Sequence, residues 1–256
     1  MRANNNLTEL ETKQKKIALI LAVIFVFLIL LDFVIISLIF TWADWVSMLI
    51  FSLLFMVPAY ISNASMVFTG GGKPIDGGRN LRDGRRILGD HKTWNGLKGP
   101  LFIGIPISFF IFLLFIGLWL PIKEIVLDSL SQGQYILYNN VKIFEYYFKG
   151  GAIPINFMVL IIRIILASYG AVIGDLVGSF LKRRFDIRSG APFWIVDQLD
   201  FALFALLFVS IPSLLFPGLF LLPDFFIVIF VIILTPAVSI IANTVAYFLG
   251  VKSVPW

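Results

Sequence analysis

Six long apolar runs dominate this chain and decide what it can fold into. An α-helix needs about 20 apolar residues to cross the hydrocarbon core of a bilayer, and each run is close to that length or longer. A soluble domain of 256 residues could not bury a chain that is 59% hydrophobic. We therefore predict an all-α, polytopic integral membrane protein. Its expected spans lie at about 17–40, 45–68, 100–120, 153–178, 199–216 and 225–249.

Three features modify this plan. The first run is too long for the h-region of a signal peptide and lacks a small-residue cleavage site, so we expect it to remain as a span. Asp32 interrupts that run; an acid at membrane depth is often functional, but Asp32 could equally lie near the far interface or face a neighbouring helix. Arg163 in the fourth run is expected to snorkel or to pair with a polar neighbour. Residues 121–152 mix charged and aromatic side chains, which predicts an interfacial helix or a pair of helices.

The polar stretch 70–99, called the first polar loop below, lies between two of these runs. It carries seven Lys or Arg, three Asp and nine of the twenty glycines of the chain. Such a stretch could be a plain connector. However, glycine lets backbone N–H groups close around an anion, and Lys and Arg are the side chains that bind phosphates. The composition favours a phosphate-binding loop at a membrane surface.

The placement of positive charge predicts the topology. With the N-terminus in the cytoplasm, sixteen of the twenty Lys and Arg residues fall in cytoplasmic segments, as the positive-inside rule requires. Two polar loops, at about 69–99 and 180–198, then share the cytoplasmic side and can meet over one site. We expect a multi-pass protein of the cell membrane whose site faces the cytoplasm.

A second group of polar residues surrounds the later loop. Asp175, Ser179, Lys182 and Arg183 follow one another at helical spacing and share a face. Asp197 and Asp200 are three residues apart at the head of the fifth span and also share a face. Juxtamembrane charges in mutual salt bridges would explain the basic residues but not the acids clustered with them. Carboxylates beside Lys and Arg suit a hard divalent cation such as Mg²⁺ bound together with a polyphosphate.

These motifs resemble those of a known family. GDLVGSFLKRR at 174–184 and DQLD at 197–200 are similar to the signature of the CDP-diacylglycerol synthetase superfamily. GGGKPID, DGRRILGD and KTWNG in the first polar loop resemble its archaeal branch, the CDP-archaeol synthases. APFWIV stands where the bacterial members have GHGG, and His91 stands where a glycine is expected, so His91 is not expected to be essential. The resemblance covers about residues 45–250 and separates 1–44, a tail with an additional span, from a catalytic domain at 45–256.

The resemblance implies a Mg²⁺-dependent transfer of CMP from CTP to a lipid phosphate. It assigns Asp175 and Asp197 to the metal, with Asp200 as the second acid of the DxxD element. Lys182, Arg183 and Lys92 would act on the phosphates. The further substrate-binding candidates are Ser179, Thr93, the backbone of Gly70, Gly71 and Gly72, and the charged residues Arg82, Asp83, Arg85 and Arg86. Asn63 and Trp94 are candidates for the cytosine or ribose, although Asn63 could instead cap a helix and Trp94 could be an interfacial anchor.

The expected partners are CTP, a lipid phosphate bearing isoprenoid ether chains and the surrounding membrane lipids, with no nucleic acid; an oligomer is compatible with the sequence. Two other classes were weighed. A CDP-alcohol phosphotransferase should carry DG-x-x-A-R followed by spaced acids, whereas this chain has Asp83-Gly84-Arg85-Arg86 without them. A transporter should place charges at the bilayer midplane within inverted repeats, and neither is evident in the sequence. Because the chain has no cysteine, disulfides and thiolate metal sites are excluded.

Overall fold

The computed structural model describes residues 2–187 and 191–250, with side chains described from residue 12 onward. Within these residues the chain is helical and has no sheet; only two isolated bridges, Pro74–Thr93 and Asn80–Arg86, occur in the first polar loop. Six helices have the length and composition to cross a membrane. The all-α membrane architecture is therefore confirmed.

The helices follow the predicted runs closely. They are α1 (Arg2–Ile39), α2 (Trp42–Phe68), a short 3₁₀ turn η1 (Gly96–Lys98), a π-helical turn η2 (Pro100–Gly104), α3 (Ile105–Gly117), α4 (Trp119–Ser131), α5 (Val141–Lys149), α6 (Ile155–Arg184), α7 (Trp194–Leu215) and α8 (Phe225–Phe248). Residues 121–152 were expected to form one interfacial helix or a pair. They form a pair, because the range includes most of α4 and all of α5. The third span extends over Gly96–Gly117 and so begins and ends slightly earlier than predicted.

The second polar loop is shorter than the sequence suggested. We expected it to begin near residue 180, but α6 continues to Arg184. No Gly or Pro occurs between Gly178 and Arg184 to end the helix, and the basic residues of its last turn interact favourably with the negative end of the helix dipole. Lys182 and Arg183 are therefore held on a helix, and residues 188–190 of the predicted loop lie outside the described residues.

Glycines allow α6 and α7 to pack closely. Gly170, Gly174 and Gly178 are spaced four residues apart on α6. A Cβ atom at Gly170 would lie 2.8 Å from the Cα of Ala205, and one at Gly174 would lie 2.7 Å from the Cα of Phe201. Small residues at this spacing let two membrane helices approach backbone to backbone. The approach places the acids at the start of α7 against the end of α6.

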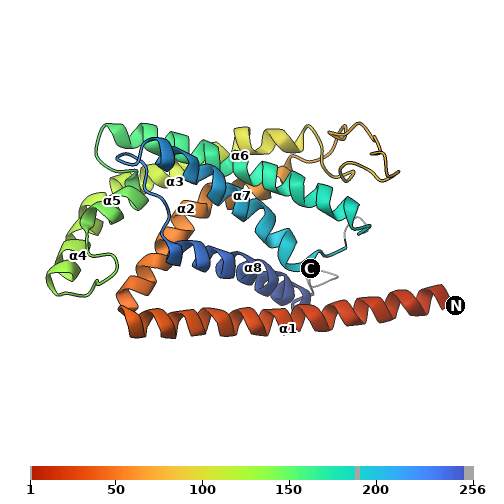
Figure 1. Cartoon of the computed structure of the whole chain (residues 1–256), viewed down its shortest axis with the longest axis horizontal. Coiled ribbons are helices and arrows are strands. Elements are labelled where there is room, and N and C mark those ends of the chain that lie inside the picture. The colour runs from red at the N-terminus through yellow and green to blue at the C-terminus, as the bar shows by residue number, and fades with distance from the viewer. Residues whose placement is uncertain (1, 188–190, 251–256) are drawn as a thin grey trace.

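Polar segments gather at both ends of the bundle (Figure 1). The first polar loop, the end of α6 and the start of α1 lie at one end, while α4 and α5 lie at the other. The added helix α1 packs along α8 through Ala22, Phe25, Ala237 and Ile240. The Asp32 carboxylate accepts a hydrogen bond of 2.8 Å from the Trp45 indole of α2. Of the interpretations considered for Asp32, the structure thus shows contact with a neighbouring helix.

Candidate active site

Two cavities adjoin at the end of the bundle that carries the first polar loop. The first, of about 380 Å³, lies between the end of α2, the loop and α6. The second, of about 200 Å³, lies between α6, α7 and the loop segment at 89–92. Both are lined by His91, Lys92 and Asp175. The two cavities are therefore neighbouring compartments with a common wall.

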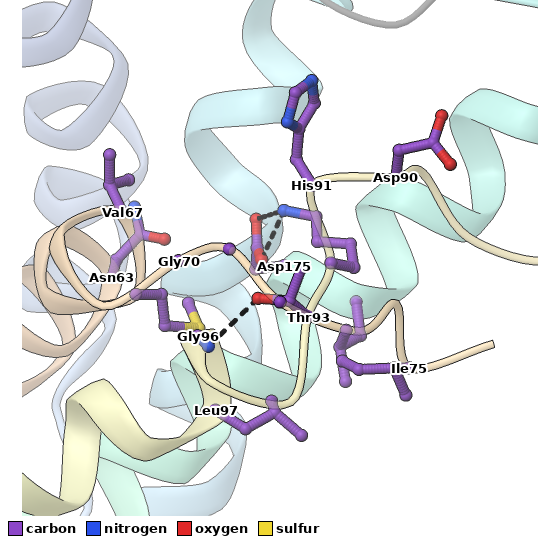
Figure 2. A pocket seen from close by; sticks show the side chains of 15 residues that line it. Asn63, Val67, Gly70, Ile75, Asp90, His91, Thr93, Gly96, Leu97 and Asp175 are labelled. Carbon is purple, nitrogen blue, oxygen red and sulfur yellow. Dashed lines mark hydrogen bonds and ion pairs between the residues drawn. The ribbon is translucent and has the colours of Figure 1, made fainter. Parts of the chain in front are cut away.

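An ion pair forms this common wall. The Nζ atom of Lys92 lies 2.6 Å from both carboxylate oxygens of Asp175 (Figure 2). The two side chains are only 25% and 22% exposed, so the pair is partly shielded from water. Charge-assisted hydrogen bonds of this length are among the stronger ones in proteins. Through this contact the first polar loop is tied to α6 at the mouth of the membrane domain.

A second ion pair crosses the smaller cavity. Lys182 Nζ on α6 lies 2.7 Å from an Asp197 carboxylate oxygen on α7, and the same oxygen accepts a hydrogen bond of 2.9 Å from the Phe193 N–H. Arg183 also lines this cavity, and its buried Nε has no hydrogen-bond partner among the described residues. Ser179 Oγ accepts the Gly89 N–H at 3.2 Å. Unpaired donors and a guanidinium at a helix end suit an anionic ligand.

Asp200 completes the acidic part of the smaller cavity. Its carboxylate lies against Gly178, so close that a Cβ atom there would overlap it. Unlike Asp175 and Asp197, it has no lysine or arginine partner in the described part of the chain. Three carboxylates, from the end of α6 and the start of α7, thus face one cavity.

These three acids are the candidate ligands of a metal ion. Among the described residues, no three acidic or histidine side chains lie close enough to form a ready-made site. However, Mg²⁺ typically takes only one or two protein carboxylates and completes its shell with phosphate and water. Ammonium groups lie against two of the three carboxylates, so cations are accommodated where the resemblance places the metal. The oxygen-only donor set fits a hard divalent cation.

The larger cavity has a polar wall and an apolar wall. Gly71 and Gly72, with φ of +99° and +80°, line it with backbone rather than side chains. The Asn63 side chain also lines it and makes no hydrogen bond to the described residues (Figure 2). The apolar wall includes Val67, which is 82% exposed at the end of α2. This cavity therefore reaches the outer surface of the helix bundle.

Thr93 has a structural partner. Its Oγ1 accepts the Gly96 N–H at 3.2 Å, at the start of η1 (Figure 2). Thr93 lines the larger cavity but is only 4% exposed. Its side chain therefore stabilises the turn into the third span.

Five of the predicted binding residues are not brought to either cavity: Arg82, Asp83, Arg85, Arg86 and Trp94. Arg86 instead forms ion pairs with Asp76 at 2.9 Å and with Asp90 at 2.5 Å. Asp83 pairs with Arg184 at the end of α6. These ion pairs stabilise the fold of the loop and attach it to α6. Sequence spacing alone could not distinguish this structural role of the charges from phosphate binding.

The ionisation of the loop acids agrees with this role. Burial raises the pKa of Asp76, but hydrogen bonds from the Arg86 guanidinium and from the Leu88 and Gly78 N–H groups outweigh it, and the net effect lowers the pKa. The pKa of Asp83 is also lowered, chiefly because its carboxylate accepts a hydrogen bond from the Arg85 N–H. Both acids remain ionised near neutral pH and hold their arginines.

The sequence missed two residues, Arg184, which supports the site from beside it, and His91, which lies in it. Arg184 donates hydrogen bonds to the Asp83 carboxylate and to the carbonyls of Arg85 and Arg86, and so clamps the loop onto α6. His91, expected to be dispensable, lines both cavities. The motif KRR at 182–184 could have indicated the role of Arg184, because a third consecutive basic residue at the end of a helix can bind a neighbouring loop.

The sequence matches the CarS-like family, described as CDP-archaeol synthase, over residues 45–130 and 122–256. The chain belongs to the CDP-archaeol synthase family. The CDP-archaeol synthase of Methanosarcina barkeri is 38% identical over 208 residues, covering 78% of this chain and all of that protein. That of Thermococcus onnurineus is 37% identical and covers 82% of this chain and 98% of the relative.

A solved structure described as an intramembrane enzyme for archaeal membrane lipid biosynthesis is 27% identical and covers 78% of this chain and 90% of that one. The TM-score between the two chains is 0.39. The match to the CDP-archaeol synthase family begins at residue 45. Helix α1 thus lies outside it.

Proposed function

We propose that this protein transfers CMP from CTP to digeranylgeranylglyceryl phosphate, giving CDP-archaeol and pyrophosphate, in a Mg²⁺-dependent reaction. The observation that carries the proposal is the pair of cavities that share the Lys92–Asp175 wall. One cavity is lined by acids and bases and the other reaches the outer surface of the bundle. A water-soluble nucleotide and a membrane lipid need two such compartments joined at the reacting atoms.

The smaller cavity suits the triphosphate. Lys182 and Arg183 would bind its oxygens, with Ser179 beside them on the same helix face. Asp175 and Asp197 would hold Mg²⁺, with Asp200 in support. When bound, the metal would neutralise charge on the phosphates and orient them.

The larger cavity suits the lipid phosphate and its glycerol. Lys92 borders both compartments and is placed to hold the lipid phosphate beside the α-phosphorus of CTP. The backbone of Gly70–Gly72 and the free amide of Asn63 add donors on the polar side. A lipid phosphate oxygen attacks the α-phosphorus and the bond to pyrophosphate breaks. Because the nucleophile is already an anion, positioning and charge neutralisation suffice, and no covalent intermediate is needed.

The location follows from the same arrangement. We propose that the end of the bundle with the two cavities faces the cytoplasm, where CTP is made and where the positive-inside rule puts the basic loops. Residues 45–256 would form the catalytic domain and residues 1–44 an added anchor.

The experiment is turnover of radiolabelled CTP with archaeal ether-lipid phosphate in detergent micelles, with Mg²⁺ or with EDTA. The variants are Asp197→Asn and, as a control at the far end of the bundle, Glu124→Gln. We expect lipid-extractable label that requires Mg²⁺, is lost in Asp197→Asn and is retained in Glu124→Gln. Folded wild-type protein that labels neither ether nor ester lipid phosphates would overturn the proposal.

A further inference from the structure

A third hollow lies on the first polar loop and is not explained by the two cavities of the active site. It has a volume of about 720 Å³ and is lined mainly by Lys73, Ile75, Arg79, Ile87, Leu88 and Trp94. We call it the Trp94 groove. Trp94 is 55% exposed here and lines neither of the other cavities, although the sequence had suggested it for the nucleotide.

The groove carries unbalanced positive charge. Its one acid, Asp76, has a side chain only 1% exposed and is held by Arg86 at 2.9 Å and by the Gly78 and Leu88 N–H groups. Lys73 and Arg79 form no ion pair or side-chain hydrogen bond with the described residues. Two cations therefore face the groove with no protein anion to meet them. This charge is complementary to an anion such as a phosphate.

The groove lies at the level of the membrane surface. Trp94 precedes the third span, Gly96–Gly117, by two residues. Its N–H donates to the Lys73 carbonyl at 3.1 Å, and Pro74 bridges Thr93, so Lys73 is held at the same height. Within the first turns of this span, Phe102 is 68% exposed. Tryptophan and lysine at the start of a span are typical of the headgroup layer.

The groove also adjoins the active site. Ile75 lines the larger cavity (Figure 2) and also lines the Trp94 groove, so the two hollows meet at this side chain. The larger cavity in turn shares Lys92 and Asp175 with the smaller one. Three compartments thus follow one another from the membrane surface to the paired carboxylates.

We propose that the Trp94 groove captures the phosphate headgroup of the acceptor lipid from the bilayer surface before the lipid enters the larger cavity. The inference rests on the proposed function, because it names the route of the same acceptor. Lys73 and Arg79 bind the phosphate, while Trp94, Ile87 and Leu88 contact the glycerol and the first part of the hydrocarbon chains. Ile75 lies at the passage to Lys92.

A nucleotide is the other anion that two cations and an indole could bind. The lining favours the lipid, because Ile75, Ile87 and Leu88 offer no polar group to a base or ribose, whereas glycerol ethers and hydrocarbon need none. The level of the groove beside the start of the third span also places it where a lipid headgroup arrives by lateral diffusion.

The test measures the kinetics of Lys73→Gln/Arg79→Gln in mixed micelles, with lipid phosphate and CTP each varied at saturation of the other. The matched control is Lys16→Gln/Lys98→Gln, which removes the same charge from exposed positions on α1 and η1 that line none of the three hollows. Loss of two interfacial cations should raise the KM for lipid phosphate by about thirtyfold. We expect the KM for CTP and kcat to stay unchanged, and the control to behave as wild type.

Two more measurements keep the result interpretable. Lys73→Arg/Arg79→Lys keeps both charges and should restore the wild-type KM, and unfolding curves report whether each variant is folded. In EDTA without CTP, purified wild type should retain more lipid phosphate through gel filtration than Lys73→Gln/Arg79→Gln.

The other outcomes each overturn the capture site. A raised KM for CTP alone would show that the groove binds the nucleotide. An equal rise in the KM for lipid phosphate in the control variant would show that general surface charge, not the groove, causes the effect. Unchanged constants and unchanged retention would show that nothing binds there. All three outcomes leave turnover by wild type intact, whereas failure of the proposed function would abolish turnover in wild type itself.

Discussion

The two ends of this bundle both bring charged side chains out of water, but they do so in opposite ways. At the end with α4 and α5, Asp44 is fully buried and accepts hydrogen bonds from the Ile136 and Tyr138 N–H groups, each at 3.0 Å. At the other end, Asp175 and Asp197 are partly exposed and pair with lysines across cavities. One end is filled and the other is open.

At the filled end, Asp44 and Arg163 are held mainly by backbone groups. Arg163, which is fully buried, donates to the carbonyls of Tyr146 and Tyr147 at 3.2 and 3.1 Å and lies over the ring of Phe112. Of the two expectations for Arg163, pairing with polar neighbours is therefore confirmed and snorkelling is not.

Tyr138 closes the same region. Its hydroxyl donates to Asp224, and burial, as the main cause, raises its pKa so that the phenol stays protonated.

The difference separates structural charge from functional charge. Backbone partners cannot be exchanged for a ligand without unfolding, so the charges near α4 and α5 fix these two helices in place. Lysine partners on flexible side chains can be exchanged for a ligand, so the ion pairs at the open end leave carboxylates available. Breaking charges at the two ends should therefore give opposite phenotypes.

The largest effect is expected for Asp175→Asn. It removes the charge at the wall between the cavities, and loss of one such electrostatic contact should lower kcat by about 10²–10³-fold. Because a side chain of similar shape remains at a partly exposed position, the unfolding midpoint should hardly change. Steady-state turnover together with thermal unfolding in detergent measures both. Retained turnover would exclude Asp175 from the site.

Gly178→Ala should give the next largest effect. Alanine normally stabilises a helix interior, but here the new Cβ would overlap the Asp200 carboxylate and force it to move. A displacement of about 1 Å near reacting groups can cost up to about 10²-fold in rate. Gly117→Ala is the control, since nothing lies within 4 Å of its Cβ position. Equal kinetics for both variants would show that the position of Asp200 does not matter.

Asp44→Ala is the counterpart at the filled end. It leaves the buried Tyr138 N–H and the partly buried Ile136 N–H without their partner, which should lower the free energy of unfolding by about 2–3 kcal/mol. Turnover per folded molecule should stay at the wild-type value. Chemical denaturation followed by circular dichroism, with activity normalised to the folded fraction, checks this. A specific loss of kcat with normal stability would contradict the division between the two ends.

The loop that carries Lys92 should lose stability in acid. Asp76 has a folded-state pKa below its ordinary value of 3.8, so the stabilisation it gives is complete above that value. It is lost as pH falls through the folded-state pKa. Limited proteolysis of the first polar loop should therefore speed up below about pH 4 in wild type. Asp76→Asn should be cleaved faster already at pH 6 and show less dependence on pH, and identical profiles would contradict the assignment.

The smallest effect on catalysis is expected from deletion of residues 1–40. Among the described residues, α1 packs on α8 and hydrogen-bonds Trp45, and none of its residues lines either cavity of the active site. Kinetic constants should be unchanged, while each 1 kcal/mol lost with the α1–α8 contact lowers the unfolding midpoint by about 2–4 °C. A large fall in kcat in stable, truncated protein would assign α1 a catalytic role.

Sequence alone was sufficient for the spans and for the residues of α6 and α7 that face the smaller cavity. Apolar runs of span length leave a chain no solvent but lipid, so the six helices followed from composition and length. Asp175, Ser179, Lys182 and Arg183 came together because helical spacing places them on one face, and the structure keeps all four on α6. These are local consequences of periodicity, which a sequence contains completely.

Only the tertiary structure decided how the first polar loop is used. By composition, its arginines and Asp83 resembled ligands of a phosphate. In the folded loop, however, Arg86 pairs with Asp76 and Asp83 pairs with Arg184. Trp94 lines a separate groove. Spacing could not show this, because the partners lie up to about a hundred residues apart and glycine permits many paths between them. Which charged side chains remain free to bind a ligand depends on which ion pairs form in three dimensions, and here the packing of the loop against α6 determines those pairs.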